Sequence, residues 1–389
     1  MAVSQEDIAY EIFSWLPAKT ICKFGLTCPS FSNFQKESHF KTKQSCNLLG
    51  MNDTCFFLQH DQISQRYQKR IELHHVPKEQ QQLSGVPDNV LTFLSNSACV
   101  LASSNGLLLC HTINDDPFEL FICNPITKSC FFIPTPESVR KNHNNSNINF
   151  ILDCTHCSSD DYLMFYFENT NEWSPTSYTC NIYHGKEGAW KGVENNFLSG
   201  GRNMKFDTPV IHNGTLHFIS DCSNYFTRLS PFYKPYIMSY SFVEGTSSIL
   251  KLPREAIKGF HVECNMGIFN WGKVRSSNTS ICLVKSRKSV FTIWILKDYK
   301  SCSWQKILKV RVNALGLEEK DAHVTGFTVM NGNILVFSTK HKIYSCGLDE
   351  ETFMMVEEIG SHSCGSNPHF ISYSNTLRSC GANDKTMSC

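Results

Sequence analysis

Apolar residues follow a helical spacing only near the start of the chain. Ile8, Ile12 and Leu16 recur every four residues, which places them on one face of a helix. Ser4 is a suitable N-cap for this helix. Pro17 either ends the helix or opens the next one at its first position, where a missing N–H costs least. The pattern therefore predicts an amphipathic helix over the first sixteen or so residues.

Two more short helices are expected before residue 44. Ile21 and Phe24 mark the first of them, and Phe31 and Phe34, opened by Pro29, mark the second. Helices this short are marginal in water, so packing must hold the module together. The apolar surface of this module either docks on the rest of the chain or is covered by a partner protein.

Beyond Cys46 the pattern changes to short runs of β-forming residues separated by turn clusters. Examples are Leu107–Cys110, Leu120–Cys123, Tyr162–Phe167 and Val290–Ile295. Such a pattern is typical of sandwiches, barrels and propellers.

A repeat separates these three architectures. Asn-Gly, a strong hairpin-turn signal, precedes an apolar strand at Asn105, Asn213 and Asn331, at intervals of 108 and 118 residues. Trp190 and Trp304 lie 114 residues apart. A propeller blade takes roughly 40–50 residues, so each interval fits two blades. The spacing predicts a β-propeller of about six blades, although five or seven also fit.

The predicted fold is thus mainly β, with three helices at residues 1–44 and the propeller at 45–375. We expect the strand near Cys55 and the late strand Phe370–Tyr373 to share a blade and close the ring, which removes exposed sheet edges. After Leu377 no periodic apolar pattern remains, so residues 376–389 are expected to be a disordered tail.

Composition narrows the function. The 36 Lys and Arg balance 35 Asp and Glu, so no broad basic field for nucleic acid or anionic membrane is expected. The start of the chain has no positively charged segment followed by an apolar core, as a secretory signal would. No apolar run approaches the roughly 18 residues of a membrane span. These patterns favour a cytoplasmic or nuclear protein, whose 19 cysteines are expected to be mostly buried thiols.

Motifs for catalysis or for cofactor binding are missing from the sequence. There is no Gly-x-Gly-x-x-Gly or Walker loop, no His-Glu-x-x-His and no Gly-x-Ser-x-Gly. Cys154 and Cys157 form one close pair, but a zinc site needs a second pair at matching spacing. We therefore expect a non-catalytic protein with no metal and no cofactor.

The N-terminal residues resemble an F-box. Glu6–Phe24 is similar to the first half of that motif, and Thr27–Phe31 with Phe34 continues it. The positions that match in order and spacing are Ile12, Leu16, Pro17, Lys19, Phe24, Cys28 and Phe40. The usual opening Leu-Pro is replaced near Val3, and Phe31 stands where the motif has Trp.

This resemblance implies binding to a Skp-type adaptor and, through it, to the cullin of a ubiquitin ligase. The adaptor-contact residues that it implies are Ile8, Ile12, Leu16, Pro17, Phe24, Cys28 and Phe31.

A second resemblance lies in the β region. Ser103–Cys110 followed by Cys123–Lys128, and Val210–Phe218 further on, resemble the kelch-like F-box-associated propeller domain of plant F-box proteins. Together the two resemblances imply the substrate-recognition subunit of an SCF-type cullin-RING ubiquitin ligase. The alternatives are a propeller scaffold whose drifted F-box no longer engages a ligase, or a ligand-binding or hydrolytic propeller with acids and histidines converging on its channel.

One loop is the candidate contact for a protein substrate. Asp221–Tyr236 is rich in aromatic residues and contains an arginine, and such residues dominate interface hot spots. Its candidate residues are Tyr225, Phe226, Arg228, Phe232, Tyr233 and Tyr236. The alternative is that these rings fold back onto neighbouring blades.

Overall fold

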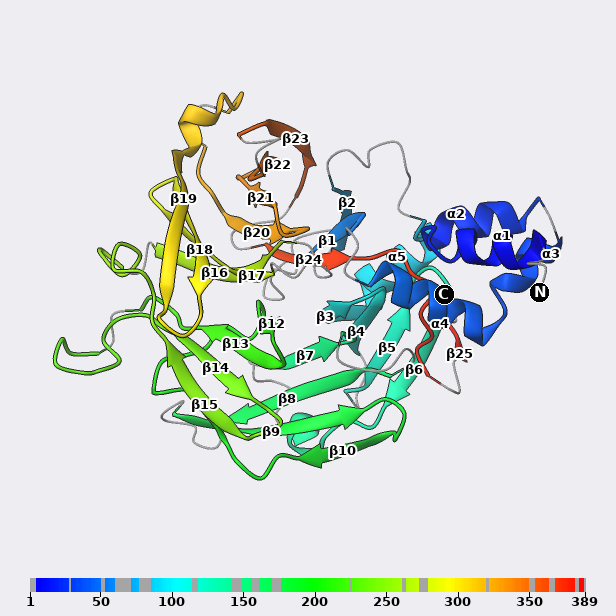
Figure 1. The fold of residues 1–389 in the computed structure, drawn as a ribbon, viewed down its shortest axis with the longest axis horizontal. Coiled ribbons are helices and arrows are strands. Elements are labelled where there is room, and N and C mark those ends of the chain that lie inside the picture. The colour runs from blue at the N-terminus through cyan, green and yellow to red at the C-terminus, as the bar shows by residue number, and fades with distance from the viewer. Residues whose placement is uncertain are drawn as a thin grey trace.

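The computed structural model describes most of the chain as a helical module beside a ring of β-sheets (Figure 1). The described residues are 5–27, 29–49, 53–59, 71–76, 85–113, 118–141, 149–155, 161–169, 176–223, 226–260, 264–272, 279–319, 322–349, 354–363, 368–381 and 385–387.

The helical module contains one helix more than the sequence pattern predicts. Its helices are α1 (Gln5–Phe13), α2 (Ala18–Gly25), α3 (Pro29–Phe34) and α4 (Ser38–Leu48). The last of these runs across the predicted boundary at residue 44. Its exposed positions are polar, and its buried face combines the apolar Phe40 and Leu48 with the polar Gln44 and Ser45, so the usual apolar stripe is weak.

Six antiparallel sheets form the blades of a propeller, as predicted. The first blade is β3 (Ala98–Ser104), β4 (Leu107–Thr112), β5 (Leu120–Asn124) and β6 (Ser129–Ile133). The second is β7 (Phe150–Asp153), β8 (Leu163–Asn169), β9 (Ser177–His184) and β10 (Ala189–Gly192), with β11 (Phe197–Leu198) beside β9. The third is β12 (Val210–His212), β13 (Thr215–Ile219), β14 (Ile237–Ser241) and β15 (Thr246–Leu250).

The remaining blades complete the ring. The fourth is β16 (Cys264–Trp271), β17 (Ser280–Arg287), β18 (Val290–Asp298) and β19 (Ser303–Arg311), followed by the short helix η1 (Val312–Leu315). The fifth is β20 (Gly326–Met330), β21 (Ile334–Ser338), β22 (Lys342–Gly347) and β23 (Val356–Ser361). The sixth is β2 (Ile71–His75), β1 (Cys55–Gln59) and β24 (His369–Tyr373). Two further helices, α5 (Asp88–Ser97) and α6 (Glu137–Lys141), lie in connections.

The repeated motifs occupy equivalent places in alternate blades. Asn105, Asn213 and Asn331 each have positive φ, as does the glycine after each, and each pair joins the first two strands of the first, third or fifth blade. This is the left-handed conformation that a tight hairpin needs. The prediction that each interval spans two blades is therefore confirmed.

Trp190 and Trp304, whose spacing also supported two blades per interval, make equivalent contacts. Trp190 lies in the outermost strand of the second blade and Trp304 in that of the fourth. Each indole N–H donates to a carbonyl just beyond the last strand of the preceding blade, Trp190 to Pro134 at 2.6 Å and Trp304 to Lys251 at 2.9 Å. Each of these two hydrogen bonds links a blade to the one before it.

The ring closes by pairing the two ends of the β region, as predicted. β1 lies between β2 and β24, with Cys55 opposite Tyr373 and Gln59 opposite His369. The sixth blade therefore takes strands from both ends of the β region. Opening the ring would break the hydrogen bonds between β1 and β24.

The segment after β24 differs from the predicted disordered tail. Thr376, Leu377 and Cys380 are buried, and β25 (Lys385–Thr386) pairs with β6. The side chain of Asn124 donates to the carbonyls of Thr376 at 3.0 Å and Arg378 at 2.8 Å. These bonds satisfy buried backbone groups without a regular apolar period, which is why the hydrophobic pattern did not reveal the ordered segment.

The same segment joins the helical module to the propeller. Leu377 lies in the core of the module with Ala18, Ile21 and Phe40. Its backbone N–H donates to the side-chain oxygen of Gln44 at 2.9 Å. The backbone N–H of Ala18 donates to the carbonyl of Asn375 at 3.0 Å. We call residues 375–380 the C-terminal clasp.

Replacing Leu377 by alanine should loosen the helical module from the propeller. The leucine is 2% exposed, and truncating a buried leucine costs about 2–5 kcal/mol. We expect faster hydrogen exchange in α1, α2 and α4, with the blade strands unchanged. Leu229→Ala is the matched control, because Leu229 is 96% exposed. Unchanged exchange in the helices of Leu377→Ala would show that the clasp does not hold them.

Candidate functional site

The helical module exposes a cluster of large apolar side chains. They are Ile8, Ile12, Trp15, Phe24 and Leu26. The first three follow one another at intervals of four and three residues, so they form one stripe along α1 and the turn after it. A solvent-exposed apolar stripe on a small helical unit is typical of a surface that another protein covers.

The structure places the predicted adaptor-contact residues in two groups. Ile8, Ile12 and Phe24 are exposed, whereas Leu16, Pro17 and Phe31 are half-buried and support the module from within. Cys28 lies outside the described residues. The sequence reasoning left out Trp15 and Leu26, although the position of Trp15, three residues after Ile12, continues the stripe.

Two interactions hold the exposed stripe in place. Phe13 packs against Phe31 with the rings tilted and their centroids 4.5 Å apart, and meets Phe24 edge-on at 5.2 Å. An ion pair joins Glu11 of α1 to Lys43 of α4, and the hydrogen bond from Lys43 lowers the pKa of Glu11. The stripe is thus fixed relative to α4 and, through it, to the C-terminal clasp.

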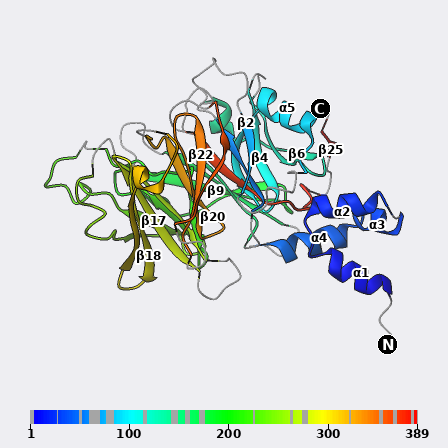
Figure 2. The same cartoon turned by 90° about the horizontal axis from the view of Figure 1, so that it is seen from above.

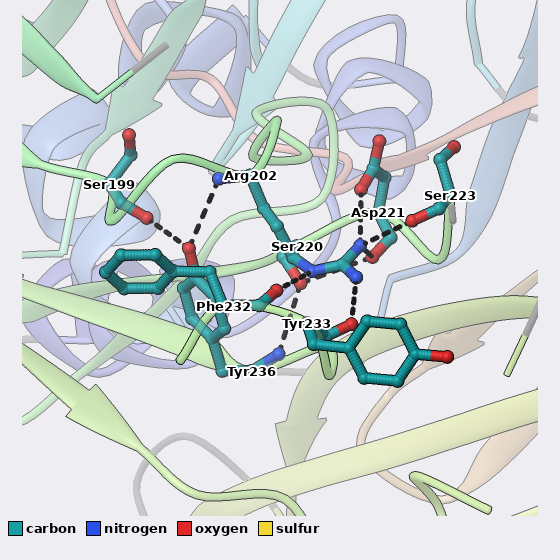
Figure 3. Close-up of polar contacts among 8 residues, drawn as sticks. All are labelled: Ser199, Arg202, Ser220, Asp221, Ser223, Phe232, Tyr233 and Tyr236. Atoms are coloured by element: carbon teal, nitrogen blue, oxygen red, sulfur yellow. Dashed lines mark hydrogen bonds and ion pairs between the residues drawn. The ribbon is translucent and has the colours of Figure 1, made fainter. Parts of the chain in front are cut away.

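The predicted substrate loop is organised by an arginine that precedes it. Arg202 is fully buried, and its guanidinium donates to the loop backbone from several sides (Figure 3). Nε donates to the carbonyl of Phe232 at 2.7 Å, and Nη2 donates to that of Tyr233. Nη1 donates to the carbonyl of Ser223 at 2.9 Å and to the carboxylate of Asp221 at 3.1 Å. One side chain therefore fixes both ends of the loop.

Several rings of the loop fold inward around this arginine. Phe226 and Phe260 lie 5.5 and 5.6 Å from the guanidinium carbon, close enough for cation–π attraction. Tyr236 is 5% exposed, and its hydroxyl donates to the carbonyl of Ser199 at 2.6 Å. Gly200 has φ +79°, and a β-carbon there would lie 2.7 Å from the ring of Phe232. The strand connection must pass this close for the rings to pack.

The predicted substrate-contact residues therefore separate by exposure. Tyr236 is buried, while Phe226, Phe232 and Tyr233 are half-buried against the loop's own support. Arg228 is exposed, and next to it Leu229, which sequence reasoning did not select, projects almost fully into solvent. Tyr225 lies outside the described residues. Arg202 was also missed, because it precedes the loop by some twenty residues.

Replacing Arg202 by alanine should release the loop. Removing one partner of a buried ion pair costs about 3–5 kcal/mol, and here several loop carbonyls would also lose a donor. We expect trypsin to cleave after the exposed Arg228 much faster in the folded variant, and urea unfolding to begin at lower concentration. Arg254→Ala removes an exposed arginine of the same domain and is the control. Equal cleavage rates at Arg228 in both variants would contradict the clamp.

The central channel has a volume of about 550 Å³ and is lined by the innermost strands of the blades. Three acids, Asp53, Asp153 and Asp207, are among its lining residues, and the first two accept hydrogen bonds from neighbouring side chains. The carboxylate of Asp53 accepts a bond from the hydroxyl of Ser374 at 2.6 Å, and burial raises its pKa. Asp153 accepts bonds from the backbone N–H and hydroxyl of Thr155 at 2.7 and 2.6 Å.

The described residues contain no group of three or more His, Cys, Asp or Glu placed to hold a metal ion. In the same part of the chain, no helix is long and apolar enough to cross a membrane.

Comparison with known proteins gives one strong match. Residues 64–380 match the family model described as the F-box associated beta propeller domain. No curated protein matches the chain.

The solved structures that match share little sequence with this chain. A chain from the S. cerevisiae complex of Dbp5 with Nup159 and Gle1 is 12% identical with a TM-score of 0.29, and this chain spans only 62% of its length. That match covers 62% of this chain. Oligogalacturonate lyase from Vibrio parahaemolyticus is 8% identical, with 80% of this chain and 87% of that chain covered and a TM-score of 0.38. Acylaminoacyl peptidase from Pyrococcus horikoshii is 12% identical, with 79% and 44% covered and a TM-score of 0.38.

Proposed function

Because the chain belongs to the F-box-associated β-propeller family, we propose that it is the substrate-recognition subunit of an SCF-type cullin-RING ubiquitin ligase from a plant. Residues 1–44 act in this proposal as an F-box that binds a Skp-type adaptor and, through it, a cullin. The propeller binds the protein that is to be ubiquitinated. Such a complex would work in the cytoplasm or the nucleus.

The observation that carries the proposal is the exposed apolar stripe of Ile8, Ile12 and Trp15 beside an otherwise packed module. Full burial of a side chain of this size contributes about 1.5–3 kcal/mol, and since 44–57% of each of the three is exposed, a partner could gain about half of that from each. The module is also bound to the propeller through the C-terminal clasp. A substrate held by the propeller would therefore keep a defined position relative to the adaptor, which raises its effective concentration at the transfer site.

In this proposal the chain does no chemistry itself. It selects the substrate and positions it, and other subunits transfer ubiquitin. We call the predicted substrate loop, Asp221–Tyr236, the aromatic loop. Two of its exposed residues, Arg228 and Leu229, are candidates for substrate contact alongside the half-buried Phe226 and Tyr233.

A second candidate function is a propeller scaffold whose helical module no longer engages a ligase. The sequence departures favour it: the opening Leu-Pro is missing, and Phe31 replaces the expected Trp. Phe31 is half-buried against Phe13, so it offers less surface to a partner than an exposed indole.

Replacing Ile12 by aspartate should abolish adaptor capture without unfolding the protein. Ile12 is 57% exposed, so a charge is tolerated in the free protein but would be buried at the interface. We expect at least a tenfold loss of affinity for a purified Skp-type adaptor in calorimetry, equivalent to about 1.4 kcal/mol. Val243→Asp adds the same charge at an exposed position of the third blade and should leave capture unchanged.

Two results would decide against the proposal. Equal adaptor affinity of Ile12→Asp and wild type would remove the stripe from the interface. Failure of folded wild type to capture any Skp-type adaptor would favour the scaffold instead.

A further inference from the structure

The fourth blade carries a concave surface that neither the helical module nor the aromatic loop uses. A cavity of about 880 Å³ lies between its outer strands and the connection from the third blade. Among the described residues, seven lysine and arginine side chains and one carboxylate, that of Glu255, line it. The whole chain has a net charge of only +1, so this is a strong local concentration of positive charge. We call it the basic cavity.

Strand register explains why these charges share one face. Lys285, Thr292 and Lys309 lie opposite one another across β17, β18 and β19, and Arg287, Val290 and Arg311 form the next row. Side chains in cross-strand rows two residues apart point to the same face of a sheet. The outer strands therefore present two parallel rows that each contain two cations.

A β-bulge adds a third row. Lys306 and Lys309 are three residues apart, which in a regular strand would place them on opposite faces. The register shifts between Ile293 and Trp294, so that Lys306 pairs with Trp294 and Ile307 is the extra residue. Because Trp294 shares its face with Thr292, the bulge brings Lys306 onto the face that carries Lys309. Bulges commonly re-aim side chains at binding sites.

The connection from the third blade supplies the other wall. The ammonium of Lys285 is buried and donates to the carbonyls of Ala256 and Lys258 at 2.6 and 2.8 Å, which fixes this connection against the blade. Lys258 and, from the β17–β18 turn, Lys288 are exposed at the rim. Lys306 is paired with Glu255, whose carboxylate lies 2.7 Å from its ammonium.

Within each row the cations of β17 and β19 are separated by a neutral residue of β18, so they lie about 10 Å apart and can contact one extended ligand together. Arginine forks bind carboxylate and phosphate in the same bidentate way. The cavity is therefore better matched to a ligand of high negative charge than to solvent alone.

We propose that the basic cavity binds an anionic segment of a protein, one that carries clustered carboxylate or phosphate groups. That the ligand is a protein rests on the proposed function, in which the propeller binds a protein substrate. The whole chain has a net charge of only +1, and Trp294, the aromatic ring among the described residues that line the cavity, is 3% exposed. A nucleic-acid strand needs a longer basic track and exposed rings for its bases to stack on.

The cavity also lies far from the helices that the proposed function assigns to the adaptor. β18 and β19 are on the opposite side of the propeller from α1–α4 in both views (Figures 1 and 2). A protein bound there would not compete with an adaptor on the helical stripe.

The test is peptide binding to the purified full chain, without any adaptor, by fluorescence anisotropy. The probes are a labelled twelve-residue Gly-Ser peptide with four glutamates, the same peptide with four phosphoserines, and an uncharged version. A single-stranded DNA dodecamer is the comparison polyanion. We expect one or both anionic peptides to bind, with affinity falling as salt rises from 50 to 300 mM, and the uncharged peptide not to bind.

Lys309→Ala with Arg311→Ala should weaken that binding at least tenfold. Both side chains are exposed, so the fold should survive their loss. Lys297→Ala with Lys340→Ala removes two exposed charges of the same propeller outside the cavity and should change affinity less than twofold.

The outcomes separate the possibilities. Preference for the glutamate or the phosphoserine peptide would identify the charged group. Binding of neither peptide, tighter binding of DNA than of both, or equal effects of the two double variants would overturn the proposal. Because no adaptor is present, failure of the wild-type chain to capture a Skp-type adaptor would leave this result unaffected.

Discussion

The pairing of β1 with β24 is the constraint on which the rest of the structure depends. The two strands are antiparallel, with Cys55 opposite Tyr373. The start of β1 and the finish of β24 therefore lie side by side at the same end of the sixth blade. Whatever precedes β1 must therefore lie beside whatever follows β24. The hydroxyl of Ser374 bonds to the carboxylate of Asp53 at 2.6 Å just beyond the paired residues, which continues the closure by one step.

This geometry gives the C-terminal clasp its role. Leu377 fills the core of a helical module too small to bury its own apolar faces, and Gln44 joins the clasp to the carbonyl of Leu16. The ordered tail that follows the closing strand therefore also carries the contacts that hold the helical module. Of the two alternatives for the apolar surface of the module, packing within the chain holds for part of it, and coverage of the rest by a partner stays a prediction. Ile21 and Phe40 are covered from within, while Ile8 and Ile12 stay exposed.

Features that depend on local backbone chemistry were predictable from the sequence. Asn105-Gly106 and its two repeats need positive φ wherever they occur, so their spacing gave the blade count. The helical stripe followed from the four-residue spacing of Ile8 and Ile12 in the same way. The ordered tail did not, because its stability comes from bonds such as those of Asn124 to the carbonyls of Thr376 and Arg378, some 250 residues away in sequence. The inward rings of the aromatic loop depend likewise on Arg202, which no local pattern connects to them.

The basic cavity shows the limit of pattern reasoning most clearly. Strand alternation assigns a face to each residue only while the register is regular, and on that rule Lys306 and Lys309 belong to opposite faces. One extra residue, Ile307, reverses the assignment for Lys306 and places it with Lys309 and Arg311. The balanced composition of the whole chain does not reveal this local arrangement. The charge that matters to a partner is therefore set by register, and the register is fixed by pairing across the whole blade.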